Sequence, residues 1–232
     1  VIACGVMRTE LEAALPAGAG VELRFLEQGL HRSPEQLTRR LQQAIDEAAG
    51  QADEIVLGYG LCAGSVAGLR APRQGLTIPR VHDCISLFLG SRAAYERAFA
   101  ARCGTYYLTP GWVAVERDPL GVLEHDYVPR VGREDAAWAL QEELKHYTHV
   151  ALIDTGTGDR EALRARGREN ARLLGKRYVE VPGSPRLFRA LVGGPAGPRV
   201  LEWRNLLELP SRAGGGHQSC RQCIPACLRA PA

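Results

Sequence analysis

Short apolar runs alternate with longer amphipathic stretches along the whole chain. Runs rich in Val, Ile and Leu and bounded by glycine predict buried strands, whereas apolar residues spaced three or four apart predict helices. The predicted strands are residues 1–6, 21–26, 55–57, 76–78, 104–108, 149–154, 177–181 and 200–203. The predicted helices between them are residues 8–15, 34–49, 85–99, 134–147, 160–174 and 186–191, and residues 109–112 predict a turn.

This alternation of strand and helix predicts an α/β fold with mainly parallel sheets, helices on both faces and right-handed crossovers. Two Rossmann-like lobes joined near residues 112–130 fit the pattern. We expect a cysteine-bearing lobe at residues 1–115, a second α/β lobe at 116–210, and a Gly-rich, Cys-rich tail at 211–232.

Helix-capping signals support two of these boundaries. Ser33 has the side chain of a good N-cap, Pro34 suits the first helical position, and Gln36 completes a capping-box spacing. Asp83 stands where it can cap the helix that follows the fourth predicted strand.

Three cysteines each follow a different predicted strand: Cys4, Cys62 and Cys84. The carboxyl ends of parallel strands meet at one edge of a sheet, where ligands usually bind. Thiolates bind zinc and iron strongly, and three of them leave a fourth position open. We therefore predict a shared site for an iron–sulfur cluster of the 4Fe–4S type, with zinc as the alternative. The plainer interpretation is that all three are small core residues, since free cysteine is often buried.

Two side chains near Cys84 are candidates for catalysis. Arg80 ends a predicted strand and is the best candidate for contacting an anion, and His82 stands two residues before the cysteine. His82 could equally be a metal ligand or a residue that starts the helix.

The tail contains a second cysteine group, Cys220, Cys223 and Cys227, in a C-x-x-C-x-x-x-C pattern. This short chelate suits zinc or an iron–sulfur cluster. It would either form a second site or complete the first, and the alternative is a tail with incidental cysteines.

A glycine-rich loop follows the predicted strand at residues 149–154 and contains Thr155, Gly156, Thr157 and Gly158. Its amides could hold the phosphate or carboxylate of a cofactor at the N-terminus of the next helix. The loop lacks the Lys-Ser/Thr pair of a P-loop, and a plain tight turn explains it equally well.

The composition limits the classes of partner that we expect for this protein. The 232 residues carry a net charge of only +3, and no basic stripe with interleaved aromatics is present, so nucleic acid is not expected. No apolar run reaches the roughly 20 residues of a membrane span. Clustered cysteines outside a disulfide framework are typical of reduced, cytoplasmic proteins.

Several motifs together resemble the prokaryotic domain of unknown function 1638 family. The resemblance covers roughly residues 1–190 and rests on segments 3–6, 57–62, 78–84 and 104–112. Members of that family resemble neighbours of corrinoid-dependent methyl-transfer systems in anaerobes. The resemblance implies a link to methyl transfer or one-carbon metabolism without defining a reaction, and it does not account for the tail.

Our functional hypothesis is a metalloprotein with an open site for a small substrate, acting as an iron–sulfur-dependent lyase or transferase. One alternative is a zinc-thiolate protein that takes part in methyl transfer from a corrinoid protein or methyltransferase partner. Another is a non-catalytic accessory protein that delivers metal. The sequence leaves all three open.

Overall fold

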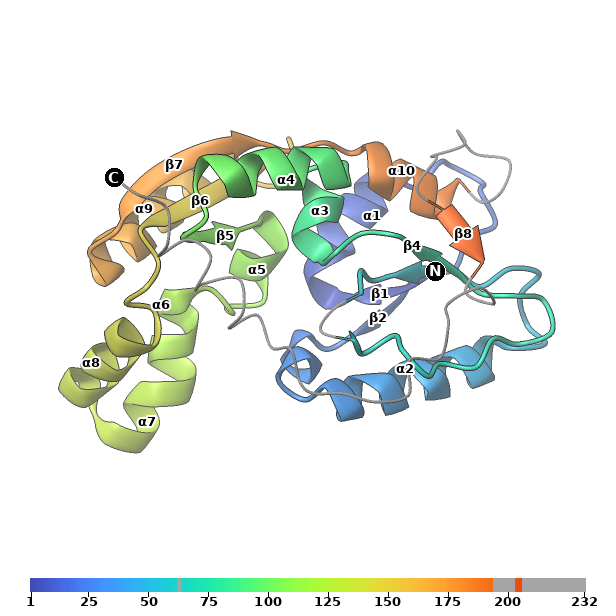
Figure 1. Cartoon of the computed structure of the whole chain (residues 1–232), viewed down its shortest axis with the longest axis horizontal. Helices are drawn as coiled ribbons and strands as arrows, with labels where there is room; N and C mark the ends of the chain where they lie inside the picture. Colours follow the sequence, from blue (N-terminus) through green and yellow to red (C-terminus); the bar gives the residue numbers. More distant parts are fainter. Residues whose placement is uncertain (62–63, 194–202, 206–232) are drawn as a thin grey trace. The chain divides into compact units, whose positions relative to one another are not determined.

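The computed structural model describes residues 1–61, 64–193 and 203–205 (Figure 1). It confirms the predicted α/β class, with two three-stranded parallel sheets. The described residues fall into two compact units. Unit 1 comprises Val1–Ala94 with the described residues from Ser184 onward, and unit 2 comprises Tyr95–Gly183.

The sheet of unit 1 has the strand order β2-β1-β3. Its strands are β1 (Ile2–Cys4), β2 (Arg24–Leu26) and β3 (Leu57–Gly58). A parallel bridge between Val56 and Thr77 places β4 (Thr77–Pro79) beside β3, and β4 pairs antiparallel with β8 (Trp203–Asn205). The first strand of the chain therefore lies inside the sheet.

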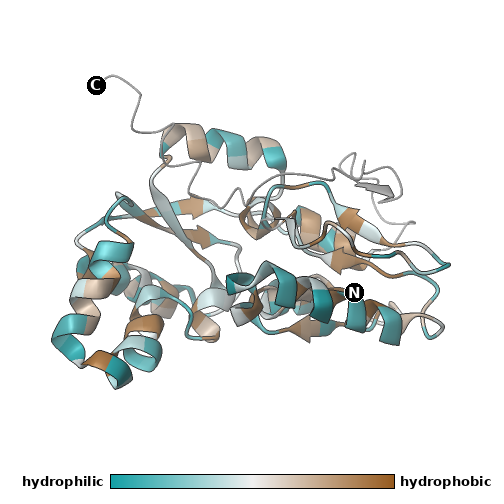
Figure 2. Cartoon of the chain, turned by 60° about the horizontal axis from the view of Figure 1, so that its bottom comes forward, coloured by the Kyte–Doolittle hydropathy of each residue, from teal (hydrophilic) through white to brown (hydrophobic). Residues whose placement is uncertain are grey.

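Helices cover both faces of this sheet (Figure 1). They are α1 (Arg8–Ala14), α2 (Pro34–Ala48), α3 (Cys84–Phe88) and α10 (Arg186–Val192), with the short helices η1 (Gly5–Met7) and η2 (Gln28–Arg32). The predicted apolar stripe of α2 is fully buried at Leu37, Leu41 and Ile45. Figure 2 shows hydrophobic residues concentrated on the strands and hydrophilic residues over much of the helices.

The sheet of unit 2 has the order β5-β6-β7, all parallel. Its strands are β5 (Thr105–Leu108), β6 (His149–Asp154) and β7 (Arg177–Pro182). The helices are α4 (Arg92–Ala101), which begins in unit 1, α5 (Pro110–Ala114), α6 (Pro119–Val122), the π-helix η4 (Leu123–Tyr127), α7 (Val128–Val131), α8 (Arg133–Glu143) and α9 (Arg160–Leu174). Leu108, Val150 and Leu152 join Leu140 and Leu163 in the core.

A buried polar cluster holds α6 against α9. The fully buried carboxylate of Asp118 accepts hydrogen bonds from Arg166 Nε at 2.7 Å and Asn170 Nδ2 at 2.5 Å. Asn170 Oδ1 in turn accepts from the Leu120 amide at 2.9 Å. The Asp118 carboxylate, the Asn170 side-chain amide and the Leu120 backbone amide thus all have hydrogen-bond partners inside the protein, as buried polar groups require.

The predicted helix at residues 85–99 is in fact two helices, α3 and α4. Gly90 separates them with a φ of +81°, and a side chain at that position would collide with Ser184. The hydroxyl of Ser91 then accepts from the Ala94 amide at 3.0 Å, which starts α4. A contact with a residue far along the chain therefore ends the first helix.

Capping explains two further differences. The predicted turn at residues 109–112 is the start of α5, because Thr109 Oγ1 accepts from the Trp112 amide at 3.3 Å and Pro110 fits the first turn. The Ser33 side chain makes no capping hydrogen bond, so that detail was wrong, although Pro34 does begin α2. The predicted Asp83 cap is confirmed by its bond from the Ser86 amide.

Candidate functional site

The carboxyl edge of the unit 1 sheet contains the switch point of its strand order. The chain passes from β1 to β2 on one side, then crosses to β3 and β4 on the other. In open α/β sheets, ligands bind outside the carboxyl ends of the strands at such a point. Cys4 is the last residue of β1, and residues 59–61 follow directly after β3.

The loops that follow β3 and β4 touch backbone to backbone. The Leu61 amide donates to the Val81 carbonyl at 3.0 Å. A Cβ atom added to Gly60 would lie 2.7 Å from Cα of Asp83 and 2.8 Å from its nitrogen. Only glycine, which has no Cβ, avoids this collision. The chain entering Cys62 and the chain entering Cys84 are therefore held together at this edge.

Two of the predicted ligands, Cys4 and Cys84, are buried. Cys4 is fully buried and Cys84 is 6% exposed. Burial raises the pKa of the Cys4 thiol to about 11, despite an opposing backbone hydrogen bond. Cys4 is thus a neutral thiol at physiological pH, and a bound metal would have to displace its proton.

The remaining predicted ligands, Cys62, Cys220, Cys223 and Cys227, lie outside the described residues. Among residues 1–61, 64–193 and 203–205, no three His, Cys, Asp or Glu side chains form a group that could hold a metal ion. The two described cysteines, Cys4 at the end of β1 and Cys84 at the start of α3, are of a residue type that binds metals and clusters as a thiolate. The three-cysteine site stays a prediction.

Arg80 and His82 both lie on the exposed side of the loop after β4. The Nδ1 atom of His82 is 3.2 Å from Oδ2 of Asp83, and this hydrogen bond raises the pKa of His82. His82 is therefore more readily protonated than an ordinary histidine. Its catalytic role, and that of Arg80, stay predictions.

Sequence reasoning missed two polar groups of unit 1. His31 lies in η2, after β2, with its ring centroid 6.1 Å from that of Tyr59. Its Nε2 atom is buried and has no hydrogen-bond partner in the described part of the chain, and burial lowers the pKa of His31. The Ser86 hydroxyl is likewise buried without a partner there. No local pattern marks either residue, because burial arises from packing.

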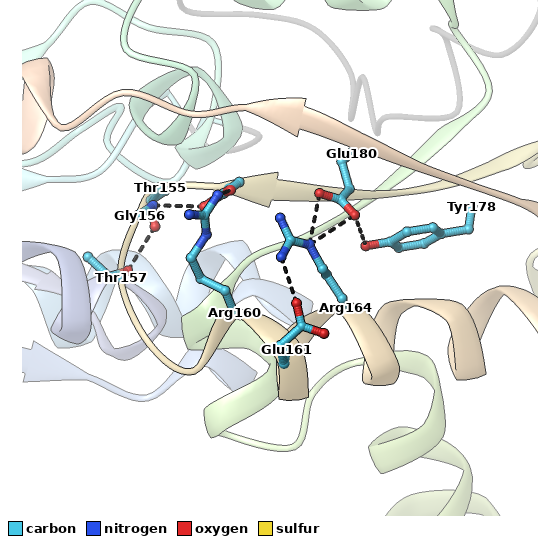
Figure 3. Close-up of polar contacts among 9 residues, drawn as sticks. Thr155, Gly156, Thr157, Arg160, Glu161, Arg164, Tyr178 and Glu180 are labelled. Carbon is cyan, nitrogen blue, oxygen red and sulfur yellow. Dashed lines mark hydrogen bonds and ion pairs between the residues drawn. The ribbon is translucent and has the colours of Figure 1, made fainter.

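The glycine-rich loop lies at the equivalent edge of the unit 2 sheet (Figure 3). The hydroxyls of Thr155 and Thr157 are 2.8 Å apart, and Asp154 Oδ1 accepts from the Gly156 amide at 3.0 Å. Arg160 forms an ion pair with the other oxygen of Asp154. The loop is therefore closed by bonds within the protein.

The N-terminus of α9 is also occupied. Asp159 caps it by accepting from the amides of Glu161 and Ala162, each at 3.1 Å. The neighbouring cavity has a volume of about 10 Å³, which is room for roughly one water molecule. Cofactor binding by Thr155, Gly156, Thr157 and Gly158 stays a prediction, and it would require these bonds to rearrange.

The arginine on the next turn of α9 also forms ion pairs with carboxylates. Arg164 Nε donates to both carboxylate oxygens of Glu180, at 3.1 and 3.2 Å, and Nη1 donates to Glu161 at 2.9 Å (Figure 3). The Tyr178 hydroxyl donates to the same Glu180 carboxylate at 3.2 Å. The positive charge at this edge is thus matched by carboxylates of the protein.

None of the helices described is long and apolar enough to cross a membrane. A comparison with curated proteins found no match, and neither did a comparison with solved structures. A family model described as a protein of unknown function, DUF1638, matches residues 25–192. The matched range includes Cys62 and Cys84, and Cys4 precedes it. Because the match spans more than half of the chain, this protein belongs to the DUF1638 family.

Proposed function

We propose that the protein is a metalloprotein in which Cys4, Cys62 and Cys84 bind an iron–sulfur cluster at the carboxyl edge of the unit 1 sheet. The observation that carries the proposal is the position of two buried thiols at the carboxyl edge of one sheet, with Cys4 at the end of β1 and Cys84 at the start of α3, after β4. Held by three thiolates, a 4Fe–4S cluster would supply one open iron as a Lewis acid for a small polar or thiol-containing substrate.

The surroundings of the thiols suit this role. Burial keeps Cys4 protonated, so binding would release a proton and grow stronger as the pH rises. The neutral imidazole of His31 and the hydroxyl of Ser86 are buried polar groups of the same unit, available to orient a substrate. Arg80 and His82, on the exposed side, would attract an anionic group of that substrate.

Anaerobic purification followed by iron, acid-labile sulfide and zinc analysis tests the proposal. We expect iron and sulfide, and their loss in each of Cys4→Ser, Cys62→Ser and Cys84→Ser. Val6→Ala is the matched control, because it disturbs the buried chain next to Cys4 without removing a thiol. A folded wild-type protein that carries neither iron nor zinc would overturn the assignment.

Stoichiometric zinc without sulfide would instead select the zinc-thiolate alternative. Methyl transfer with a corrinoid protein or methyltransferase is then the reaction to assay, and binding to such a partner without turnover would indicate an accessory role.

Replacing Cys220, Cys223 and Cys227 together by Ser shows whether the tail adds a second site. A cytoplasmic location is part of the proposal, since thiols stay reduced there.

A further inference from the structure

Unit 2 contains a larger cavity on the sheet face opposite its hydrophobic core. Side chains alternate between faces along a strand, and Leu108, Val150 and Leu152 point into the core. The other face contributes Tyr107, Ala151 and other strand residues to a cavity of about 240 Å³ that α4 also lines. The full lining is Arg97, Ala98, Arg102, Thr105, Tyr107, Ala151, Val179 and Val181.

The two arginines of this lining have no carboxylate partner among the described residues. Neither Arg97 nor Arg102 forms a side-chain hydrogen bond or ion pair with any residue that the structure describes. Other arginines of unit 2, including Arg117, Arg133 and Arg164, are each paired with a carboxylate. The lining of the cavity therefore carries two positive charges that no described carboxylate matches.

Arg177, at the start of β7, adds positive charge at the same edge, and both Arg102 and Arg177 act on the neighbouring histidine. His149, at the start of β6, has its pKa lowered first by burial and then by the charges of Arg102 and Arg177. The backbone of Arg102 is held in place, because the Thr105 hydroxyl donates to its carbonyl at 2.7 Å. A negatively charged group is thus favoured at this position.

The floor of the cavity has the opposite character. Ala151 is fully buried, and Val179 and Val181 present aliphatic side chains. An inorganic anion would leave this apolar surface exposed to water. A hydrocarbon chain would cover it, and burying apolar surface is favourable by about 25 cal/mol per Å². The volume lies below the roughly 300–1,000 Å³ of pockets for drug-sized ligands, which favours a small molecule.

We propose that this cavity binds a small amphipathic carboxylate. The carboxylate contacts Arg97 and Arg102, whose planar guanidinium groups suit carboxylate geometry, and the hydrocarbon body lies on Val179 and Val181. The site is independent of the cysteines and of the function proposed for them.

Isothermal titration calorimetry of the full chain with hexanoate tests this site. We expect saturable binding of one hexanoate per chain. Hexan-1-ol lacks the charge, and acetate and inorganic phosphate lack the apolar body, so each should bind at least tenfold more weakly. Absence of saturable hexanoate binding, or equal binding of all four probes, would overturn the proposal.

Two variants test the two halves of the site separately. Arg97→Gln combined with Arg102→Gln should weaken hexanoate binding at least tenfold, whereas Arg172→Gln, on exposed α9 surface, should not change it. Ala98→Leu keeps both charges but fills the cavity from α4, and it should also weaken binding at least tenfold. Unchanged affinity in either folded variant contradicts the assignment.

Discussion

The carboxyl edges of the two parallel sheets differ in what their side chains do. In unit 2, Asp154, Asp159 and Arg160 are bonded to neighbours or to the amides of α9. In unit 1, the edge carries the buried thiols of Cys4 and Cys84, and the unit buries two polar atoms that bond to no other described residue, on His31 and Ser86. The carboxyl edges of two parallel sheets in one chain are therefore not equivalent: one is closed by its own charges, and the other unit buries thiols and two polar atoms that bond to no other described residue.

The largest expected loss of stability comes from removing the buried ion pair of unit 2, and it tests how strongly this unit depends on that pair. Asp118→Ala leaves Arg166 and the buried Asn170 without their acceptor. Breaking a buried ion pair costs about 3–5 kcal/mol, and because the Arg166 side chain is 30% exposed we expect the lower end of that range. Urea denaturation followed by circular dichroism measures the loss.

The control for Asp118→Ala is Glu169→Ala. Glu169 is 3.8 Å from the same Arg166, and its side chain is 48% exposed, so the loss should be below about 0.5 kcal/mol. Similar losses in the two variants would show that unit 2 does not rely on the buried pair.

Gly60→Ala tests the close backbone approach in unit 1. Its new methyl group would meet the Asp83 backbone, which cannot move aside as a side chain can. Overpacking of this kind costs about 1–3 kcal/mol. Gly29→Ala is matched, since a Cβ there meets nothing within 4 Å, and it should be neutral or slightly stabilising. Thermal denaturation of both variants decides, and equal melting temperatures contradict the proposed packing.

A smaller effect compares the two helix N-termini. Asp159→Ala removes two hydrogen bonds to the amides of α9 and should cost about 1 kcal/mol. Ser33→Ala at α2 removes no capping bond, so the change should be only a few tenths of a kcal/mol. Denaturant midpoints of the two variants measure the loss of stability in each. An equal loss in both would mean that Ser33 does cap its helix.

The smallest effect concerns the pH dependence of unit 1. Burial lowers the pKa of His31 in the folded protein, so below the ordinary value of 6.5 the unfolded chain binds a proton more readily than the folded one. Stability should therefore fall as the pH drops from about 7.5 to 5.5, and this fall should be smaller in His31→Gln. Urea titrations at several pH values test it, with exposed His146→Gln as the control. An identical pH dependence of wild type and His31→Gln would place His31 in contact with solvent.

Elements with strong local signals were predictable. The bounds of β6 and α9 agree with the sequence prediction, because an apolar β-branched run and the Asp159 cap both act locally. The break between α3 and α4 was not predictable, since it depends on Ser184 packing against Gly90. Thr109 and Pro110 suit both a turn and a helix start, so local chemistry alone could not distinguish them.

The candidate site was predictable only as far as topology determines it. Residues that follow parallel strands share an edge of the sheet, which is why the sequence could place Cys4 and Cys84 at one edge, while their role stays a prediction. The burial of His31 and Ser86 depends on how η2 and α3 pack. The glycine-rich loop resembles an anion site in sequence, and the pairing of Asp154 with Arg160 emerges only from their geometry.

The chain leaves unit 1 after Ala94 and returns at Ser184, whose amide donates to the Phe88 carbonyl at 2.9 Å. Among the described residues, unit 2 is one continuous segment inserted into a discontinuous host, and Phe88 and Ser184, before and after the insertion, lie close together, as tolerated insertions require. The consequence is modularity. We expect that a short linker from the end of α3 to Ser184 would close unit 1 without the insert, so that the cysteine-bearing unit can be produced by itself.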